Sequence, residues 1–271
     1  AITGSAIAAT AAIGGIMMPI MEKKGYENTF SAPLIACGGS IGPIIPPSIT
    51  LIVYASITNV SVSQLFMGSV IPGILLAGSL IVYALVYGKR KNLPAHEKQT
   101  PKQIGHAFKE GIWALLMPII ILGGIYGGFF TPTESAAIAV VYGLIVSLFI
   151  YKDIKVKDLY RIFVKSGLTT ATTLIIMGTA STFGRLLNLE QIPTTVAESI
   201  TSVTSNKYII LLLIIVLLLI VGCFMETLAS IIILTPILLP VVTEVGVDPI
   251  HFGIIMVVGL AVGFVTPPLG V

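Results

Sequence analysis

Long apolar segments recur along almost the whole of this 271-residue chain. A helix needs about 20 apolar residues to cross the roughly 30 Å hydrocarbon core of a bilayer. Charged residues make up only 10% of the chain, against about 25% in soluble domains, so a soluble fold could not cover its surface. The composition therefore predicts an all-α, polytopic membrane protein. The segments that qualify are 66–87, 111–130, 134–151, 166–184 and 207–222, with 30–58 and 251–271 equally long but interrupted by Gly and Pro.

The charges predict topology rather than nucleic-acid binding, since the net charge is only +3. Lys and Arg favour the cytoplasmic side of a membrane. Segments 88–109 and 152–165 are the richest in these residues and are expected to be cytoplasmic loops, with His96 and His106 as loop residues. Cys37 and Cys223 lie far apart in apolar segments, which predicts neither a disulfide framework nor a zinc site.

An internal repeat relates residues 1–50 to residues 222–271 at an ungapped offset of 221 residues. Both copies read G-x-x-x-G-x-x-x-P-P near their ends. The matching positions are Pro19 with Pro240, Gly25 with Gly246, Gly38 with Gly259, Gly42 with Gly263, and Pro46-Pro47 with Pro267-Pro268. All of them are residues with special backbone properties, which makes a chance match a poor explanation.

Charge predicts that the two copies are inverted. The segment 22–27 carries Lys23 and Lys24 and is expected inside, whereas its partner 243–248 carries Glu244 and Asp248 and is expected outside. Five crossings separate the two segments if residues 207–242 dip into the membrane and return as a re-entrant hairpin. Inverted repeats with Gly/Pro-interrupted segments are typical of secondary transporters and point to their binding site.

Each Pro-Pro pair predicts a helix broken within the membrane. Proline lacks an N–H and clashes with the preceding turn, and the carbonyls that it frees need a partner other than lipid. Residues 38–50 read GGSIGPIIPPSIT and residues 263–270 read GFVTPPLG. Upstream lie two small-residue segments, 3–10 and 224–231, which are expected to form hairpin tips. A proline kink without any ligand is the alternative.

Oxygen atoms at the tips and breaks predict two cation sites. Hard cations prefer oxygen ligands, and the first set holds no titratable group, which favours Na⁺ over a proton. The first set is Thr3, Ser5, Gly42, Ile45 and Pro47, and the second is Glu226, Gly263, Thr266 and Pro268. Glu226 is interpreted as a sodium ligand, as an acceptor that hydrogen-bonds to a ligand, or as a protonated acid.

An anionic solute is expected between the tips and breaks, near Ser5, Ser48 and Thr50, with Arg185 as its counter-ion. Guanidinium binds a carboxylate through two hydrogen bonds, and half-helix N-termini favour anions. Simple capping by Ser48 and Thr50, and snorkelling of Arg185 to the outer interface, are the alternatives. Glu134 is interpreted as a carboxylate that stabilises a helix N-terminus.

Four motifs together carry a resemblance to a known family: GSAIAATAAIGGIMMPIM, GGSIGPIIPPSI, GGFFTPTESAAIAVVYGL and GFVTPPLGV. In this order they resemble the large membrane subunit, or DctM-like M subunit, of TRAP transporters. Ala6 stands where the family often has a second serine, so that hydroxyl has no counterpart here. Family chains are longer at both ends, and we expect this chain to begin within the first hairpin and to stop at the second broken helix.

The resemblance implies an elevator-type, sodium-coupled importer of an organic acid of the sialic acid or C4-dicarboxylate type. It implies a periplasmic substrate-binding protein and a small Q-type subunit as partners, in the bacterial inner membrane. The expected parts are 1–58 (first transport repeat), 59–165 (scaffold and connecting helices) and 166–271 (second repeat). No H-E-x-x-H motif and no paired aspartates in the apolar segments favour an intramembrane enzyme. The alternative is a stand-alone sodium/anion symporter of a related fold.

Overall fold

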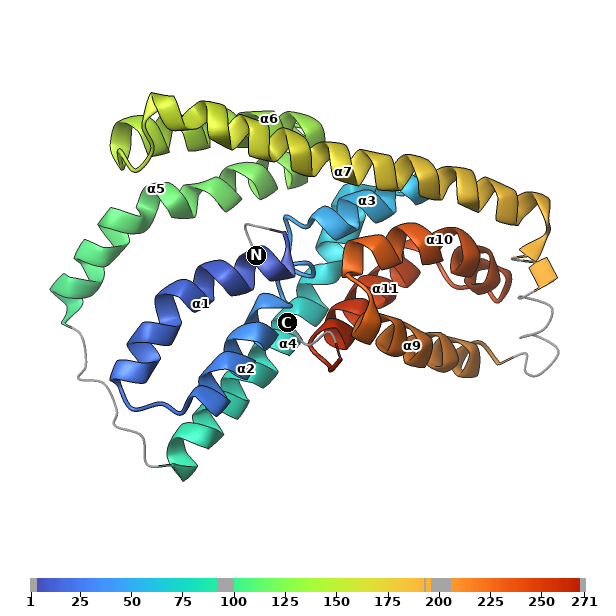
Figure 1. Cartoon of the computed structure of the whole chain (residues 1–271), viewed down its shortest axis with the longest axis horizontal. Helices are drawn as coiled ribbons and strands as arrows, with labels where there is room; N and C mark the ends of the chain where they lie inside the picture. The colour runs from blue at the N-terminus through green and yellow to red at the C-terminus, as the bar shows by residue number, and fades with distance from the viewer. Residues whose placement is uncertain (1–3, 92–99, 193, 196–205, 269–271) are drawn as a thin grey trace. The chain divides into compact units, whose positions relative to one another are not determined.

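The computed structural model describes residues 4–91, 100–192, 194–195 and 206–268, and every regular element in these ranges is helical. These residues form two compact units, one of residues 4–91 and those from 176 onward, and one of residues 100–175. The elements are α1 (Ala6–Lys23), α2 (Asn28–Gly39), α3 (Ile49–Thr58), α4 (Val62–Arg90), α5 (Pro101–Tyr126), α6 (Pro132–Ile145), the π-helix η1 (Val146–Ile150), α7 (Val156–Leu189), α9 (Lys207–Phe224), α10 (Thr227–Glu244) and α11 (Pro249–Phe264) (Figure 1).

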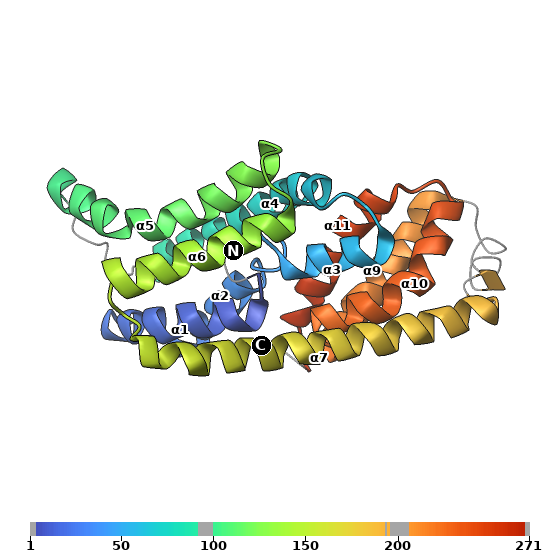
Figure 2. The same ribbon diagram turned by 90° about the horizontal axis from the view of Figure 1, so that it is seen from above.

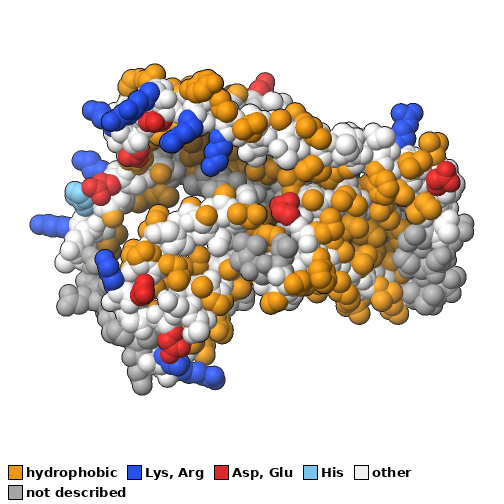
Figure 3. All heavy atoms as spheres, in the orientation of Figure 1, with side chains coloured by type: hydrophobic (Ala, Val, Ile, Leu, Met, Phe, Trp, Pro, Cys, Tyr) orange, Lys and Arg blue, Asp and Glu red, His pale blue; other side chains and the backbone are white. Residues whose placement is uncertain are grey.

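Seven of the described helices are long and apolar enough to cross a membrane: α1, α4, α5, α6 with η1, α7, α9 and α10. Their large apolar side chains point outward, as Ile71 and Leu75 on α4 do, each with 68% of its surface exposed. Hydrophobic side chains cover the visible face along α9 and α10 (Figure 3). An apolar exterior of this kind is stable only in lipid, so the chain is a multi-pass membrane protein.

Two helices begin earlier than their apolar segments, so the expectation of loops over 88–109 and 152–165 is wrong in part. α5 starts at Pro101 because Thr100 and Gln103 form a capping box, with the Gln103 side chain accepting from the Thr100 backbone N–H at 2.8 Å. His106 therefore lies on a helix, whereas His96 lies outside the described residues. α7 starts at Val156, where the Asp158 carboxylate accepts from the backbone N–H of Lys155 at 3.1 Å.

The 221-residue offset relates the backbone of α1 and α2 to that of α10 and α11. α1 and α10 begin and end at equivalent positions, and α2 and α11 begin at equivalent positions. The N-caps correspond as well, Ser5 with Glu226 and Glu27 with Asp248. Gly25 and Gly246 have φ angles of 78° and 77° in the connecting turns. The repeat is therefore present in helix boundaries, caps and turns, and not only in residue identities.

Both helices that approach a Pro-Pro pair stop before it. α2 ends at Gly39 and α3 begins at Ile49, on the far side of Pro46 and Pro47. The helix stops there because the ring of Pro43 would clash with the carbonyl four residues earlier, at Gly39. α11 continues to Phe264, because the position equivalent to Pro43 is a phenylalanine in the second copy. Both Pro-Pro peptide bonds are cis.

The core of the first unit is built around α11, which packs against α9, α10, α3 and α4. Figures 1 and 2 both show α9, α10 and α11 side by side. Phe252, Met256 and Leu260 of α11 are fully buried. Tyr54 of α3 lies over Gly253 and donates a 2.6 Å hydrogen bond to the carbonyl of Pro249, so it ties the half-helix after the first break to the start of α11.

Candidate functional site

The first hairpin tip lies directly against the first break. Gly4 has φ +60°, and a Cβ atom on it would lie 3.0 Å from the Ile49 amide nitrogen and 3.2 Å from the Pro47 carbonyl oxygen. A Cβ atom on Gly42 would lie 3.2 Å from the carbonyl oxygen of Ser5. At Gly4, only glycine combines so close an approach with a left-handed φ. The structure therefore brings together Ser5, Gly42 and Pro47 of the first predicted cation set.

The other members of that set differ in position. Ser5 is the N-cap of α1 and accepts from the Ala8 N–H at 3.5 Å. The Ile45 side chain points toward α4, where a Cβ atom on Gly73 would meet it at 2.5 Å. Thr3 lies outside the described residues.

Ser48 and Thr50 form hydrogen bonds within the first break. Both hydroxyls donate to the carbonyl of Pro43, the Thr50 bond measuring 3.0 Å, and the two hydroxyl oxygens lie 2.8 Å apart. Ser48 is also the N-cap of α3 and accepts from the Leu51 N–H at 3.3 Å. Both side chains are buried, at 1% and 4% exposure. The two hydroxyls therefore act as a cap and as partners for a carbonyl that the prolines had freed.

The second hairpin tip is the two-residue connection between α9 and α10. Glu226 is the N-cap of α10, and one of its carboxylate oxygens accepts from the N–H groups of Leu228 and Ala229 at 2.9 and 3.1 Å. This role was not among the three interpretations drawn from the sequence. The sequence did carry a signal for this capping role, because Glu226 directly precedes the segment T-L-A-S and acidic residues can cap a helix as serine does.

The second break lies beside the hairpin arm α9. A Cβ atom on Gly263 would lie 2.9 Å from the Cα of Gly222 and 2.6 Å from the Leu219 carbonyl oxygen. The Gly263 carbonyl accepts from the Thr266 N–H at 2.8 Å, and the Thr266 hydroxyl donates to the Val262 carbonyl at 3.4 Å. Thr266 and Pro268 are exposed.

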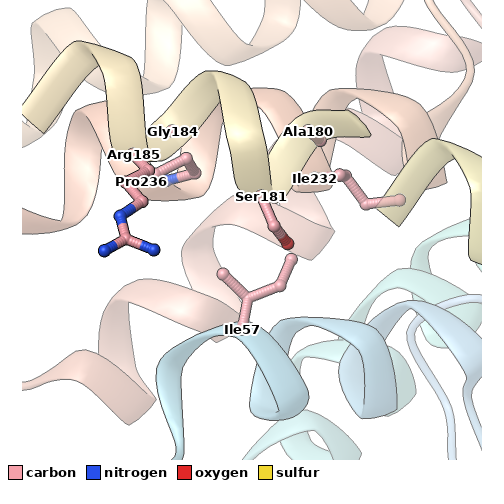
Figure 4. Close-up of a pocket in the computed structure, with 7 residues that line it drawn as sticks. All are labelled: Ile57, Ala180, Ser181, Gly184, Arg185, Ile232 and Pro236. Carbon is pink, nitrogen blue, oxygen red and sulfur yellow. The ribbon is translucent and has the colours of Figure 1, made fainter. Parts of the chain in front are cut away.

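Arg185 lines a cavity of about 290 Å³ in the first unit, between α7, α3 and α10. Figure 4 shows its side chain and that of Ser181 projecting from α7 on the side that faces α3. The described residues place no carboxylate within ion-pair distance of the guanidinium. The lining residues are Ile57, Ala180, Ser181, Gly184, Arg185, Ile232 and Pro236.

This cavity is separate from the hydroxyls near the first break. Ile57 lies near the end of α3, whereas Ser48 caps its beginning, and nine residues of helix correspond to about 13 Å. The structure thus brings Ser5, Ser48 and Thr50 to one end of α3 and Arg185 to the other. Ser181 was not predicted as a site residue, although its spacing of four residues from Arg185 places it on the same helix face.

The whole chain matches one known family. The family model described as "Tripartite ATP-independent periplasmic transporter, DctM component" matches residues 1–271. The chain belongs to this family. The resemblance drawn from the four sequence motifs is confirmed.

Several curated relatives are similar to the chain over nearly all of its length. The isethionate TRAP transporter permease protein DctMQ of Oleidesulfovibrio alaskensis is 47% identical, over all of this chain and 43% of its own length. The C4-dicarboxylate TRAP transporter large permease protein DctM of Pseudomonas aeruginosa is 41% identical, over all of this chain and 63% of its own length. The 2,3-diketo-L-gulonate TRAP transporter large permease protein YiaN of Escherichia coli is 36% identical, over 99% and 63%. The chain thus spans between about two fifths and two thirds of the relatives' length.

Proposed function

We propose that this chain is the core of a sodium-coupled secondary transporter subunit that imports an organic acid. The observation that carries the proposal is the 221-residue repeat, in which helix starts, N-caps and helix breaks recur together. Two hairpin tips that each meet a broken helix are the arrangement expected of an inverted-repeat transporter. The tips act as re-entrant hairpins, and the two copies have opposite orientations in the membrane.

Sodium binds where each tip meets its break. The first site uses oxygens of Thr3, Ser5, Gly42, Ile45 and Pro47, and the close approach of Gly4 to Pro47 supports it. The second uses Glu226, Gly263, Thr266 and Pro268, supported by the contact of Gly222 with Gly263. Carbonyl and hydroxyl oxygens in irregular backbone are suitable ligands for a hard cation.

The solute is an organic anion that approaches Ser5, Ser48 and Thr50 during transport and uses Arg185 as its counter-ion. An arginine near the end of a membrane helix, lining a cavity and without an acidic partner among the described residues, is a strong candidate for anion binding. The relatives named for isethionate, C4-dicarboxylate and 2,3-diketo-L-gulonate support an anionic substrate, and a sialic acid type is also compatible.

The transporter works in the bacterial inner membrane with two partners, a periplasmic substrate-binding protein and a small Q-type membrane subunit. In the elevator mechanism that we propose, residues 1–58 and 166–271 carry the solute, and residues 59–165 contribute scaffold and connecting helices. The relative named DctMQ supports a close association with the small subunit.

The experiment is uptake of radiolabelled organic acids into proteoliposomes that contain the complete membrane subunits, with and without Na⁺ and with and without the binding protein. We expect uptake to require both. Uptake that needs sodium but no binding protein would support a stand-alone symporter instead, and uptake that is indifferent to sodium would overturn the coupling.

The Arg185→Lys and Arg185→Ala variants test the counter-ion in the same assay. Lysine keeps the positive charge but loses the planar fork of the guanidinium, so uptake should be strongly impaired in Arg185→Lys and abolished in Arg185→Ala. Wild-type rates in both variants would show that Arg185 is an interfacial anchor.

A further inference from the structure

Helix α4 packs against the first break at one residue, Gly73. A Cβ atom on Gly73 would lie 2.5 Å from Cγ1 of Ile45, 3.3 Å from its Cδ1, and 3.5 Å from Cγ2 of Ile44. Gly73 lies on the buried face of α4, and Ile44 is fully buried. The first break is therefore in contact with two elements, the hairpin tip at Gly4 and helix α4 at Gly73.

The Ile45 side chain is poorly able to turn away from α4. Its Cβ atom is branched, which restricts the torsion that would move Cγ1. The atom nearest to Gly73 is this Cγ1, which is bonded directly to Cβ, and not the mobile end of the side chain. Residue 45 also lies in the segment between α2 and α3, outside the continuous hydrogen-bond ladder of either helix. A Cβ atom at position 73 would therefore push on the backbone of the break and not only on a methyl group.

A second glycine on α4 makes a contact of a different kind. A Cβ atom on Gly68 would lie 2.4 Å from Cδ1 of Ile254 on α11, and the next atom, Cγ1 of Ile254, is 3.7 Å away. Cδ1 is the far end of a flexible side chain and can move aside at little cost. Gly68 and Gly73 thus lie five residues apart on one helix, and only Gly73 packs against the break.

We infer that Gly73 is a positioning residue for the first cation site, because its lack of a Cβ atom lets Ile45 lie where its carbonyl oxygen can bind Na⁺. Gly73 does not touch the ion and acts only through Ile45. The inference rests on the proposed sodium site at the first break, and it adds a residue of α4 that sets the affinity of that site. The affinity of a site for a hard cation depends on the number and placement of its oxygen ligands, so a displaced carbonyl weakens binding.

Sodium binding can be measured without transport, as the rise in unfolding temperature that Na⁺ produces in the complete membrane subunits in detergent. NaCl replaces choline chloride at constant ionic strength, with no organic acid present. Gly73→Ala should raise the NaCl concentration that gives half of the maximal rise by about fivefold or more, because the added methyl group overpacks the contact with Ile45. The NaCl concentration for half-maximal uptake in proteoliposomes should rise in parallel.

Gly68→Ala is the matched control. It adds the same methyl group to the same helix, but this group meets only the far end of the Ile254 side chain. The NaCl concentration for half of the maximal rise should therefore stay within about twofold of the wild-type value.

The Ile45→Ala variant shows whether the effect passes through Ile45. Alanine keeps the backbone carbonyl but removes Cγ1 and Cδ1, so the contact with position 73 is lost. In this background Gly73→Ala should change the NaCl concentration by less than about twofold. The comparison of Ile45→Ala with Gly73→Ala/Ile45→Ala decides the question even if Gly73→Ala alone does not fold.

The outcomes separate this inference from the proposed function. An unchanged sodium affinity in Gly73→Ala, with only a lower unfolding temperature, would show that Gly73 serves packing alone and would overturn the inference. An equal loss of affinity in Gly68→Ala, or a loss that persists in the Ile45→Ala background, would overturn it as well, and the sodium coupling of the wild type would stand. A wild-type protein that NaCl stabilises no more than choline chloride would overturn the sodium coupling itself, and this inference with it.

Discussion

Gly222 of α9 and Gly263 of α11 face each other so closely that a Cβ atom on Gly222 would lie 2.9 Å from the Gly263 Cα and 2.7 Å from the Leu260 carbonyl oxygen. Backbone atoms cannot yield as a flexible side chain can. This contact fixes the hairpin arm against the helix that leads to the second break, near the tip at Glu226.

The first prediction follows from this contact. Gly222→Ala should lower the unfolding temperature of the subunit in detergent, because overpacking costs about 1–3 kcal/mol. Gly78→Ala on α4 is the matched control, since nothing lies within 4 Å of its Cβ position and alanine favours helix there. Thermal unfolding followed by far-ultraviolet circular dichroism measures the unfolding temperature of both variants. Equal stability of the two variants would contradict the close contact.

The second prediction concerns the tip–break contact in the first copy. Gly4→Ala should reduce sodium-dependent uptake about tenfold or more, because its Cβ atom meets the Ile49 amide and the Pro47 carbonyl and the overpacking cost is about 1–3 kcal/mol. Gly25→Ala is the control. Its φ is also left-handed, at 78°, but nothing lies within 4 Å of its Cβ position, so it carries only the conformational cost of about 1–2 kcal/mol. A similar loss of uptake in both variants would mean that backbone conformation, and not tip–break contact, matters.

The third prediction concerns sodium affinity. Ser5→Ala and Thr266→Ala each remove one neutral oxygen, so the sodium concentration for half-maximal uptake should rise about 2- to 10-fold without loss of coupling. Ser5 also caps α1, and Ser61→Ala controls for this, because Ser61 caps α4 by accepting from the Gln64 N–H at 3.4 Å. Wild-type sodium dependence in both Ser5→Ala and Thr266→Ala would show that the cation sites are wrongly assigned.

The fourth prediction is a pH dependence at the end of α4. The Lys91 ammonium, 3.0 Å from the Glu27 carboxylate, lowers the pKa of Glu27 below its usual 4.5 through a hydrogen bond and its charge. A lowered carboxyl pKa in the folded state stabilises the fold above the unfolded pKa, and this contribution is lost as pH falls through the folded pKa. The unfolding temperature of wild type should therefore exceed that of Lys91→Gln at neutral pH, and the difference should shrink below pH 4.5.

The control for this ion pair is Lys89→Gln, which removes an equal charge two residues away. Both Glu27 and Lys91 are about half exposed, so the effect is small and should weaken in high salt. A difference between wild type and Lys91→Gln that is constant down to the lowest pH would show that packing, and not charge, accounts for it. The Phe30 and Tyr87 rings, stacked at 3.8 Å beside this pair, are the packing that such a result would implicate.

Local features of the sequence predicted most of the helices. The apolar segment 207–222 corresponds to α9, and the Glu134 carboxylate completes the capping box of α6 by accepting from the N–H of the N-cap residue Thr131 at 2.8 Å. The polar extensions of helices were not predicted, because the start of α5 depends on a capping box at Thr100 rather than on hydropathy. The repeat could be predicted from the sequence because glycine and proline determine the conformation of their own backbone.

The candidate site was less accessible from sequence, because it depends on contacts between distant segments. The cavity joins Ile57 to Arg185 and Ile232, and nothing in the sequence near Arg185 indicates that α3 lies opposite. The burial of Ser48 and Thr50 against the Pro43 carbonyl likewise depends on how tightly the break folds back. Residue types suggested candidates, and only the fold separated those at the start of α3 from the cavity at its end.

Because the N-caps of the two copies lie at equivalent positions, each copy can serve as the control for the other. Glu27 and Asp248 occupy equivalent N-cap positions, yet Glu27 pairs with a lysine whereas the Asp248 carboxylate accepts from the backbone of Ile250 at 2.8 Å. Ser5 and Glu226 occupy equivalent N-cap positions as well but differ in charge, one neutral and one acidic. Exchanging the members of each pair changes a side chain while its helix start and turn stay the same. Such reciprocal swaps can show which copy's chemistry, rather than which copy's shape, makes transport directional.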